Sequence, residues 1–333
     1  MRITMLGSGA WGTALAQLLC NNGHDVTLWN RSPARAAEMA ETGYNPRLKD
    51  VRLHKTMKFS ADIACAADSE MVIFAVPSFA VRQTAELVSP YLRSDQVLVC
   101  VTKGIEPDTC LRMSQVIEQA TGKPAAVLSG PSHAEEVGKE IPTGCVAASS
   151  DIAVAELIQD VFMNEAFRVY ASRDTVGVEL SAALKNVIAF CAGISDGLGL
   201  GDNTKALLVT RGLTELARLG VALGGCSETF AGLAGVGDMI VTCTSMHSRN
   251  RRAGILVGQG MPVPEAMERI GAVVEGYYAA CSAYQLAEKV GVDMPITREA
   301  YAVLYEGKAP TKAIETLMQR NKRHEFEDAG WSR

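Results

Sequence analysis

The chain has 333 residues, of which 48% are hydrophobic and 21% are charged, with 30 glycines and 12 prolines. At about 150 residues per domain this length predicts two domains, and the composition excludes a disordered, collagen-like or low-complexity protein. Lysine and arginine total 32 against 37 for aspartate and glutamate, a formal net charge of -5. We therefore expect no nucleic-acid partner, and an anionic small-molecule substrate must be bound by a few placed cations.

The nine cysteines are scattered singly without a CxxC pair, and the five histidines form no HExxH motif. This pattern favours reduced cysteines in a cytoplasmic protein over a disulfide framework, and it indicates no metal site. Glycines and polar residues such as Gln17 interrupt the apolar N-terminal stretch. No run approaches the length of about 18 apolar residues that a membrane span needs, so we expect neither a signal peptide nor a span.

A βαβ pattern opens the chain. We predict a strand over Arg2–Leu6, a helix over Thr13–Cys20 and a second strand over Val26–Trp29. The turn between the first strand and the helix has the spacing Gly7-x-Gly9-x-x-Gly12. In a dinucleotide-binding turn the first glycine permits the tight turn, the second lets the backbone approach a pyrophosphate, and the third lets helix pack on strand. Helix N-terminal amides then hold the phosphates.

The residues after the second predicted strand bear on the cofactor. A carboxylate that binds the ribose 2′-hydroxyl is expected there, but the sequence is Trp29-Asn30-Arg31-Ser32. Arg31 is a cation suited to a 2′-phosphate, so we predict that NADP(H) is used at least as well as NAD(H). A solvated surface arginine is the alternative at this position.

Three further apolar runs, Met71–Val76, Val97–Val101 and Ala125–Leu128, alternate with the predicted helices Val81–Tyr91 and Cys110–Ala120. Continuous apolar runs are typical of strands buried on both faces, so we predict a doubly wound parallel sheet. Ligands bind at the carboxyl ends of such strands. Lys103 directly follows one of them and is a candidate cation, with an exposed loop lysine as the alternative.

From about Thr175 helical patterns dominate, which predicts a Rossmann domain over 1–178 and a mostly α-helical substrate-binding domain over 179–333. The stretch Glu179–Cys191 is apolar nearly all round and carries Lys185. A buried amine there is a candidate proton donor, while a lysine reaching the surface from the helix edge is the alternative. The residues beyond Arg320 are predicted to form a solvated tail.

Hydroxyl, guanidinium and amide groups follow one another at Ser248, Arg249 and Asn250. A guanidinium can bind two phosphate oxygens while the hydroxyl and the amide bind others, so the triplet suits a phosphate monoester. A basic surface turn is the alternative.

Eight motifs in order carry a family resemblance: GSGAWGTALA, VTKGIE, LSGPSHAEEV, ALKNVIA, GLGLGDNTKA, AGLAGVGDMIVTCTS, SRNRRAG and VVEGYYAA. Over roughly residues 1 to 315 the chain resembles the bacterial NAD(P)-dependent sn-glycerol-3-phosphate dehydrogenases. The resemblance implies reversible reduction of dihydroxyacetone phosphate with NADH or NADPH, a supply of glycerol phosphate for phospholipid synthesis, and a homodimer.

The resemblance also implies site residues. Those at the reacting oxygen are Lys185, Lys103 and Asp238. The substrate would be bound by Lys103, Gly130, Ser132, Lys185, Asp238, Ser248, Arg249 and Asn250. The cofactor would be bound by Gly7, Gly9, Ala10, Trp11, Gly12, Arg31, Lys103, Ala134, Arg249, Val273 and Glu275.

The chain departs from the family pattern at two places. Leu48-Lys49-Asp50-Val51 stands where Tyr-Leu-Pro-Gly is usual, and His133 stands where phenylalanine is common. Two other functions stay open: a related reductase of 2-ketoacids or hydroxyacids, and a non-catalytic nucleotide sensor.

Overall fold

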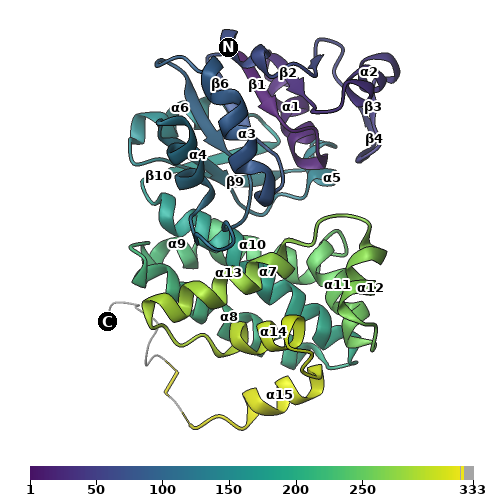
Figure 1. Cartoon of the computed structure of the whole chain (residues 1–333), viewed down its shortest axis with the longest axis vertical. Helices are drawn as coiled ribbons and strands as arrows, with labels where there is room; N and C mark the ends of the chain where they lie inside the picture. Colours follow the sequence, from purple (N-terminus) through teal and green to yellow (C-terminus); the bar gives the residue numbers. More distant parts are fainter. Residues whose placement is uncertain (323, 326–333) are drawn as a thin grey trace. The chain divides into compact units, whose positions relative to one another are not determined.

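The computed structural model describes residues 1–322 and 324–325, which form two compact units (Figure 1). The first unit contains Met1–Lys103 and Met113–Thr175, and the second contains Gly104–Arg112 and the chain from Val176 onward. Residues 323 and 326–333 of the predicted solvated tail lie outside the described residues.

The first unit, all of whose residues are described, is built on an eight-stranded sheet in the order β10-β9-β8-β7-β6-β1-β2-β5. Neighbours from β5 to β8 are parallel, but β9 pairs antiparallel with β8, and β10 is parallel to β9. The predicted Rossmann architecture is confirmed, with its last two strands reversed. The link from β8 to β9 contains only the four-residue helix α5, which is shorter than the helix of a usual parallel crossover. The strands are β1 (Arg2–Leu6), β2 (Asp25–Trp29), β5 (Lys58–Ser60), β6 (Met71–Phe74), β7 (Val97–Cys100), β8 (Ala125–Ser129), β9 (Thr143–Ala148) and β10 (Phe167–Ser172).

The order of the strands places a switch point at β1. Leu6 is in register with Trp29 on β2 and with Phe74 on β6, so the carboxyl ends of all three strands lie at one edge of the sheet. Crevices of this kind are where doubly wound sheets bind ligands. Helices α3 and α4 pack side by side, and α1 packs against α5. The helices of this unit are α1 (Ala10–Asn21), α2 (Pro33–Thr42), α3 (Val81–Val88), α4 (Met113–Thr121), α5 (Ala134–Val137) and α6 (Ile152–Phe162).

The chain between α2 and β5 forms a small antiparallel hairpin of β3 (Tyr44–Asn45) and β4 (Leu48–Arg52). This is the segment that departs from the family pattern. Asp50 in β4 has a φ of 65°, a conformation that asparagine and aspartate adopt more readily than most residues. The altered sequence is thus accommodated as an ordered hairpin.

The second unit is helical. Its central helix, α7, is long and apolar enough to cross a membrane, but 94% of the apolar window is buried inside the protein, as in a core helix. The helices are α7 (Thr175–Gly197), α8 (Asp202–Ala222), α9 (Ser227–Ala231), α10 (Asp238–Thr244), α11 (Arg249–Gly258), α12 (Val263–Ile270), α13 (Glu275–Val290), α14 (Pro295–Tyr305) and α15 (Pro310–Met318).

The segment Gly104–Arg112 packs with the second unit although it lies between two elements of the first. Ile105 is 2% exposed within the helical core, and Ser282 Oγ donates to its carbonyl oxygen at 3.4 Å. Arg112 forms an ion pair with the buried Glu179 of α7. Our predicted helix over Cys110–Ala120 therefore starts too early. Cys110 has a φ of 58° and cannot continue a right-handed helix.

A buried carboxylate of α8 caps the start of α14. Ile296 N and Thr297 N donate to the Glu215 carboxylate at 2.7 and 3.2 Å, which satisfies two amides that a helix start leaves without intrahelical partners. Burial is the largest influence on this carboxyl group and raises its pKa to about 7.

We expect Glu215→Gln to remove a pH dependence of stability. The pKa of the folded carboxyl group lies above its model value of 4.5, so the folded state binds the proton more tightly. The free energy of unfolding therefore falls as pH rises from about 4.5 to about 7, by up to about 3 kcal/mol. Denaturant unfolding at pH 5 and pH 8 measures this loss, which should be smaller in Glu215→Gln. The exposed control Glu265→Gln should show the same pH dependence as wild type. If the free energy of unfolding changed equally with pH in wild type, Glu215→Gln and Glu265→Gln, the raised pKa of Glu215 would be contradicted.

Candidate active site

The three glycines after β1 play three different steric roles. Gly7 has a φ of 118°, and a Cβ there would lie 2.7 Å from the Ala75 carbonyl oxygen. A Cβ on Gly12 would lie 2.1 Å from the Gly7 carbonyl oxygen, so α1 can pack against the turn only if this residue has no side chain. A Cβ on Gly9 would meet no atom of the described chain within 4 Å. The Gly9 backbone is thus open to a close-approaching group, as a pyrophosphate cradle requires.

Helix α1 begins at Ala10, earlier than the predicted Thr13, because Gly9 in extended conformation already serves as its N-cap. Trp11 follows in the first turn, and its Nε1 is buried without a hydrogen-bond partner in the described chain. Asn45, which was not predicted from the sequence, holds this turn through hydrogen bonds. Its Nδ2 donates to Ser8 O at 3.0 Å and to Thr13 Oγ1 at 2.6 Å.

Arg31 lies exposed just beyond the end of β2. The residues on either side of it are ordered by local hydrogen bonds: Asn30 Oδ1 accepts from Ser32 N at 2.8 Å, and Ser32 caps α2. The structure therefore leaves the guanidinium accessible at the edge where the carboxyl end of β2 lies, and its contact with a 2′-phosphate stays a prediction.

Lys103 follows β7, and Gly130 and Ser132 follow the neighbouring strand β8. The structure brings all three together: Lys103 Nζ donates to Gly130 O at 2.9 Å, and Ser132 Oγ donates to the same oxygen at 3.0 Å. Lys103 is half-buried, so the alternative of a freely exposed loop lysine is wrong. Ala134 starts α5 close behind and is buried.

Lys185 lies in the middle of α7 and is only 4% exposed, so the alternative of a lysine reaching the surface is wrong. Its Nζ forms an ion pair with the Asp238 carboxylate, which is 1% exposed. It also donates to Thr242 Oγ1 at 2.7 Å. Burying an ammonium and a carboxylate is costly unless each is paired, and here each has a charged partner.

The local fold around Asp238 explains how a carboxylate comes to meet Lys185. A π-helical turn over Leu233–Gly237 leads into α10, which begins at Asp238. Turns of this type occur frequently at functional sites. Thr242 was not predicted from the sequence, although it lies four residues after Asp238 and hence on the same helix face. Its hydroxyl donates to Asp238 O at 2.6 Å while it accepts from Lys185.

A series of two hydrogen bonds links the helices α7, α11 and α13. Asn250 Nδ2 donates to Asn186 Oδ1 at 2.8 Å, and Gly276 N donates to Asn250 Oδ1 at 2.8 Å. These hydrogen bonds hold the side chain of Asn186, the neighbour of Lys185 in α7. They were not predicted from the sequence.

The predicted phosphate triplet stands at the start of α11 and is not a surface turn. Ser248 is its buried N-cap and accepts from Arg251 N at 3.2 Å, while the Arg249 side chain is exposed. The helix N-terminus adds favourable potential for an anion beside Arg249. Val273 and Glu275 lie at the start of α13 and are half-buried.

Across residues 1–322 and 324–325, no group of three or more histidines, cysteines and acids is placed to hold a metal ion. What the second unit offers is a buried, hydrogen-bonded ammonium next to a carboxylate. Such a pair can donate a proton to an oxygen on which negative charge develops.

The comparisons with known proteins cover both units. Models of the NAD-dependent glycerol-3-phosphate dehydrogenase N-terminus and C-terminus match residues 2–155 and 174–315. The chain belongs to this family. It is 52% identical over 327 residues to a glycerol-3-phosphate dehydrogenase [NAD(P)+] of Thermoanaerobacter sp. (strain X514), covering 98% of this chain and 99% of the relative. The identity to the enzyme of the same name from Moorella thermoacetica is also 52%, covering 99% of both chains.

A solved structure supports the same assignment. The crystal structure of glycerol-3-phosphate dehydrogenase from Coxiella burnetii superposes with a TM-score of 0.92 at 38% identity, covering 96% of this chain and 99% of that one. The resemblance seen in the sequence motifs is thereby confirmed. The chain is an oxidoreductase of the NAD(P)-dependent glycerol-3-phosphate dehydrogenase family, with a Rossmann unit followed by a helical one.

Proposed function

We propose that this protein reduces dihydroxyacetone phosphate to sn-glycerol 3-phosphate, reversibly, with NADH or NADPH. The observation that carries the proposal is the buried ion pair of Lys185 and Asp238, because ketone reduction needs a positioned proton donor. A nucleotide sensor without catalysis needs no such costly pair. Membership of the family across both units supports the cofactor and the substrate.

The residues of the glycine-rich turn fit a dinucleotide. The open backbone at Gly9 and the amides at the start of α1 suit the pyrophosphate, and the orphaned Trp11 Nε1 adds a donor nearby. The residues that would hold the cofactor are Gly7, Gly9, Ala10, Trp11, Gly12, Arg31, Lys103, Ala134, Arg249, Val273 and Glu275. When bound, the reduced nicotinamide supplies a hydride to the ketone carbon.

Lys185 acts on the ketone oxygen. As negative charge develops there, Nζ donates a proton. Family membership supports Lys103 as a second cation of the proposed substrate set. Asp238 and Thr242 orient the ammonium, since both contact Nζ. In the reverse direction the amine of Lys185 takes the proton back from the alcohol.

The phosphate of the substrate is bound away from the reacting carbon. Arg249 provides an exposed guanidinium at the start of α11, and Ser248 and Asn250 flank it in the sequence. Gly130 and Ser132 complete the proposed substrate set together with Lys103. Binding energy spent on the phosphate aligns the carbonyl for reaction.

We also propose that the protein acts in the cytoplasm as a homodimer, and that its product serves phospholipid synthesis. Family membership supports these points, and glycerol phosphate is the chemical backbone of a phospholipid.

An oxidation assay tests the proposed function. We expect NADPH and NADH to be oxidised rapidly with dihydroxyacetone phosphate and at least 100-fold more slowly with pyruvate or 2-ketobutyrate, which lack the phosphate that Arg249 would bind. We expect kcat/KM with NADPH to equal or exceed that with NADH, because Arg31 is available to a 2′-phosphate and no carboxylate follows β2.

The assay separates the alternatives. Faster turnover of a 2-ketoacid would identify a related reductase, and cofactor binding without any turnover would identify a sensor. A large preference for NADH would contradict the role of Arg31, and Arg31→Ala measured with both cofactors would then show no selective loss with NADPH.

A further inference from the structure

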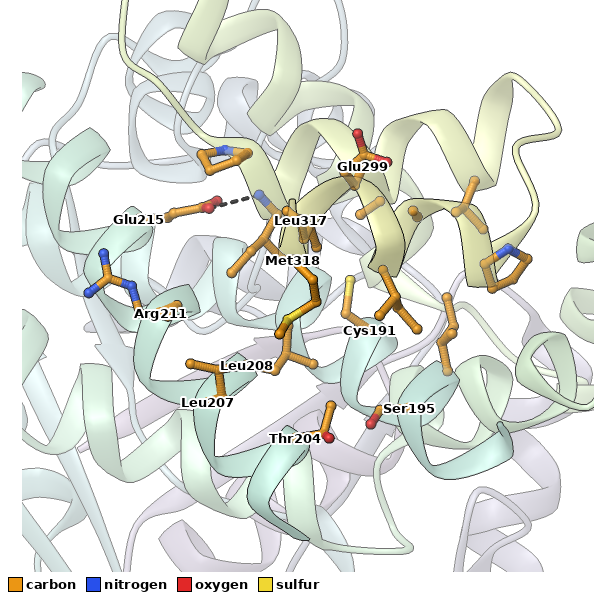
Figure 2. Close-up of a pocket in the computed structure, with 18 of the residues that line it drawn as sticks. Cys191, Ser195, Thr204, Leu207, Leu208, Arg211, Glu215, Glu299, Leu317 and Met318 are labelled. Carbon is orange, nitrogen blue, oxygen red and sulfur yellow. Dashed lines mark hydrogen bonds between the residues drawn. The ribbon is translucent and has the colours of Figure 1, made fainter. Parts of the chain in front are cut away.

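The second unit contains a partly open apolar cavity, whose described lining includes Glu215 and the start of α14 but no residue of the candidate active site. Its volume is about 260 Å³, and it lies among the C-terminal part of α7, α8, α14 and α15 (Figure 2). Leu208, Ile296, Val303 and Leu317 are among the side chains of its wall. Neither Lys185 nor Asp238 lines it in the described part of the chain. Apolar cavities with a few polar groups are the usual form of small-molecule sites.

Two polar atoms in the wall lack partners. Ser195 is 4% exposed, and its Oγ makes no hydrogen bond within residues 1–322 and 324–325; the same holds for Arg218 Nε. A buried polar atom without a partner costs about 1–3 kcal/mol, so its presence calls for a reason. In Figure 2, Ser195 lies near Thr204 at one end of the lining, whereas Arg211 and Glu215 lie at another. An amphipathic ligand would therefore place its polar head at one of these two ends and its apolar body along the wall between them.

The charges at the cavity favour an anionic head. Both carboxylates of the lining already have strong donors: Glu215 accepts from Ile296 N at 2.7 Å, and Glu299 accepts from Lys308 Nζ at 2.5 Å.

The arginines of the lining differ in how firmly they are paired. Arg320 is paired with Asp293 at 2.8 Å, and Arg218 Nη1 bonds the Asp293 carbonyl. Arg211 has the longest contacts of the three: its Nη1 lies 3.5 Å from the carbonyl oxygen and 3.8 Å from the carboxylate oxygen Oε1 of Glu325. A carboxylate could therefore recruit the Arg211 guanidinium at little cost.

The cavity has the size of a medium hydrocarbon chain. A group of the size of water or methylene occupies about 30 Å³, so the cavity has room for roughly nine such groups. Leu207 of α8 and Met318 of α15 belong to its lining and are 50% and 69% exposed, so apolar surface continues from the cavity to solvent. We propose that this cavity binds an amphipathic anion, a carboxylate with a chain of eight to ten carbons, with its chain among α7, α8, α14 and α15 and its head at Arg211. The proposal is independent of the catalysed reaction.

Calorimetric titration of the full-length protein with butyrate, octanoate, nonanoate and decanoate tests the proposal. We expect saturable binding of one octanoate or decanoate per chain, no measurable binding of butyrate, and about threefold to fourfold tighter binding per added methylene group. Decanol and decylamine carry a similar chain with a neutral or cationic head and should bind at least tenfold more weakly than decanoate. Linear, unsaturable uptake, or equal affinity for decanol, would overturn the proposal.

Two variants locate the site. Ala300 is 3% exposed and lines the cavity, so Ala300→Leu should fill the space, abolish decanoate binding and keep or raise the Tm. The partly exposed Arg211→Gln should fold normally, weaken decanoate at least tenfold and leave decanol unchanged. Unchanged decanoate affinity in both variants would refute the site. Binding seen only after dilution of a dimer into monomers would instead show that a second copy covers the cavity, and would also overturn the proposal.

Discussion

Lys185→Ala is expected to lower kcat for dihydroxyacetone phosphate by about 1,000-fold to 10,000-fold, the range for loss of a positioned general acid with its charge. The affinity for NADPH should stay within about twofold, because Lys185 belongs to α7 and the glycine-rich turn does not contain it. Steady-state kinetics and a fluorescence titration with NADPH measure the two quantities.

The control separates chemistry from folding, since the variant leaves the buried Asp238 without its ammonium partner. The exposed Lys312→Ala should behave as wild type, and thermal unfolding reports any loss of stability. Added methylamine should restore part of the turnover of Lys185→Ala by supplying an amine in the space of the lost side chain. Turnover near that of wild type in Lys185→Ala would show that another group donates the proton.

Arg249→Ala is expected to raise the KM for dihydroxyacetone phosphate by about 100-fold, because a charge-assisted bond to phosphate is lost. The Arg249 side chain is exposed at the start of α11, so its removal should leave the Tm unchanged. At saturating NADPH, activity with unphosphorylated dihydroxyacetone should fall far less, so the variant would lose most of its preference for the phosphorylated ketone.

Two further variants sharpen this test. Arg249→Lys keeps the charge but not the two-pronged geometry and should fall between wild type and alanine. The exposed arginine at the end of α12 gives the matched control, Arg269→Ala, which should be neutral. An unchanged KM in Arg249→Ala would exclude this residue as the phosphate anchor.

Local patterns predicted the nucleotide-binding unit well. The strands β1, β2, β6, β7 and β8 were all recognised within two residues of their observed ends, because buried parallel strands appear as continuous apolar runs. The glycine spacing was equally informative, since each glycine answers a steric demand within a few residues. The reversal of β9 was not predicted, because strand direction depends on the path of the chain after β8.

The polar pairings of the helical unit were harder to foresee. Asp238 and Thr242 are far from Lys185 in sequence, and Asn45 is remote from Ser8, so no local period connects them. The sequence left Lys185 open between the core and the surface. Whether a lysine on an apolar helix is buried depends on whether another helix brings it a counter-charge.

The sequence by itself determined the Rossmann class, the glycine-rich turn, the family and the cations available to an anionic substrate, since these follow from residue types at short spacings. Only the tertiary structure decided that Lys185 is buried against Asp238 and Thr242, and that Gly104–Arg112 packs with the helical unit. It also revealed the cavity beside α14 and α15. Burial, pairing and enclosed space arise from contacts between distant segments, which local patterns do not encode.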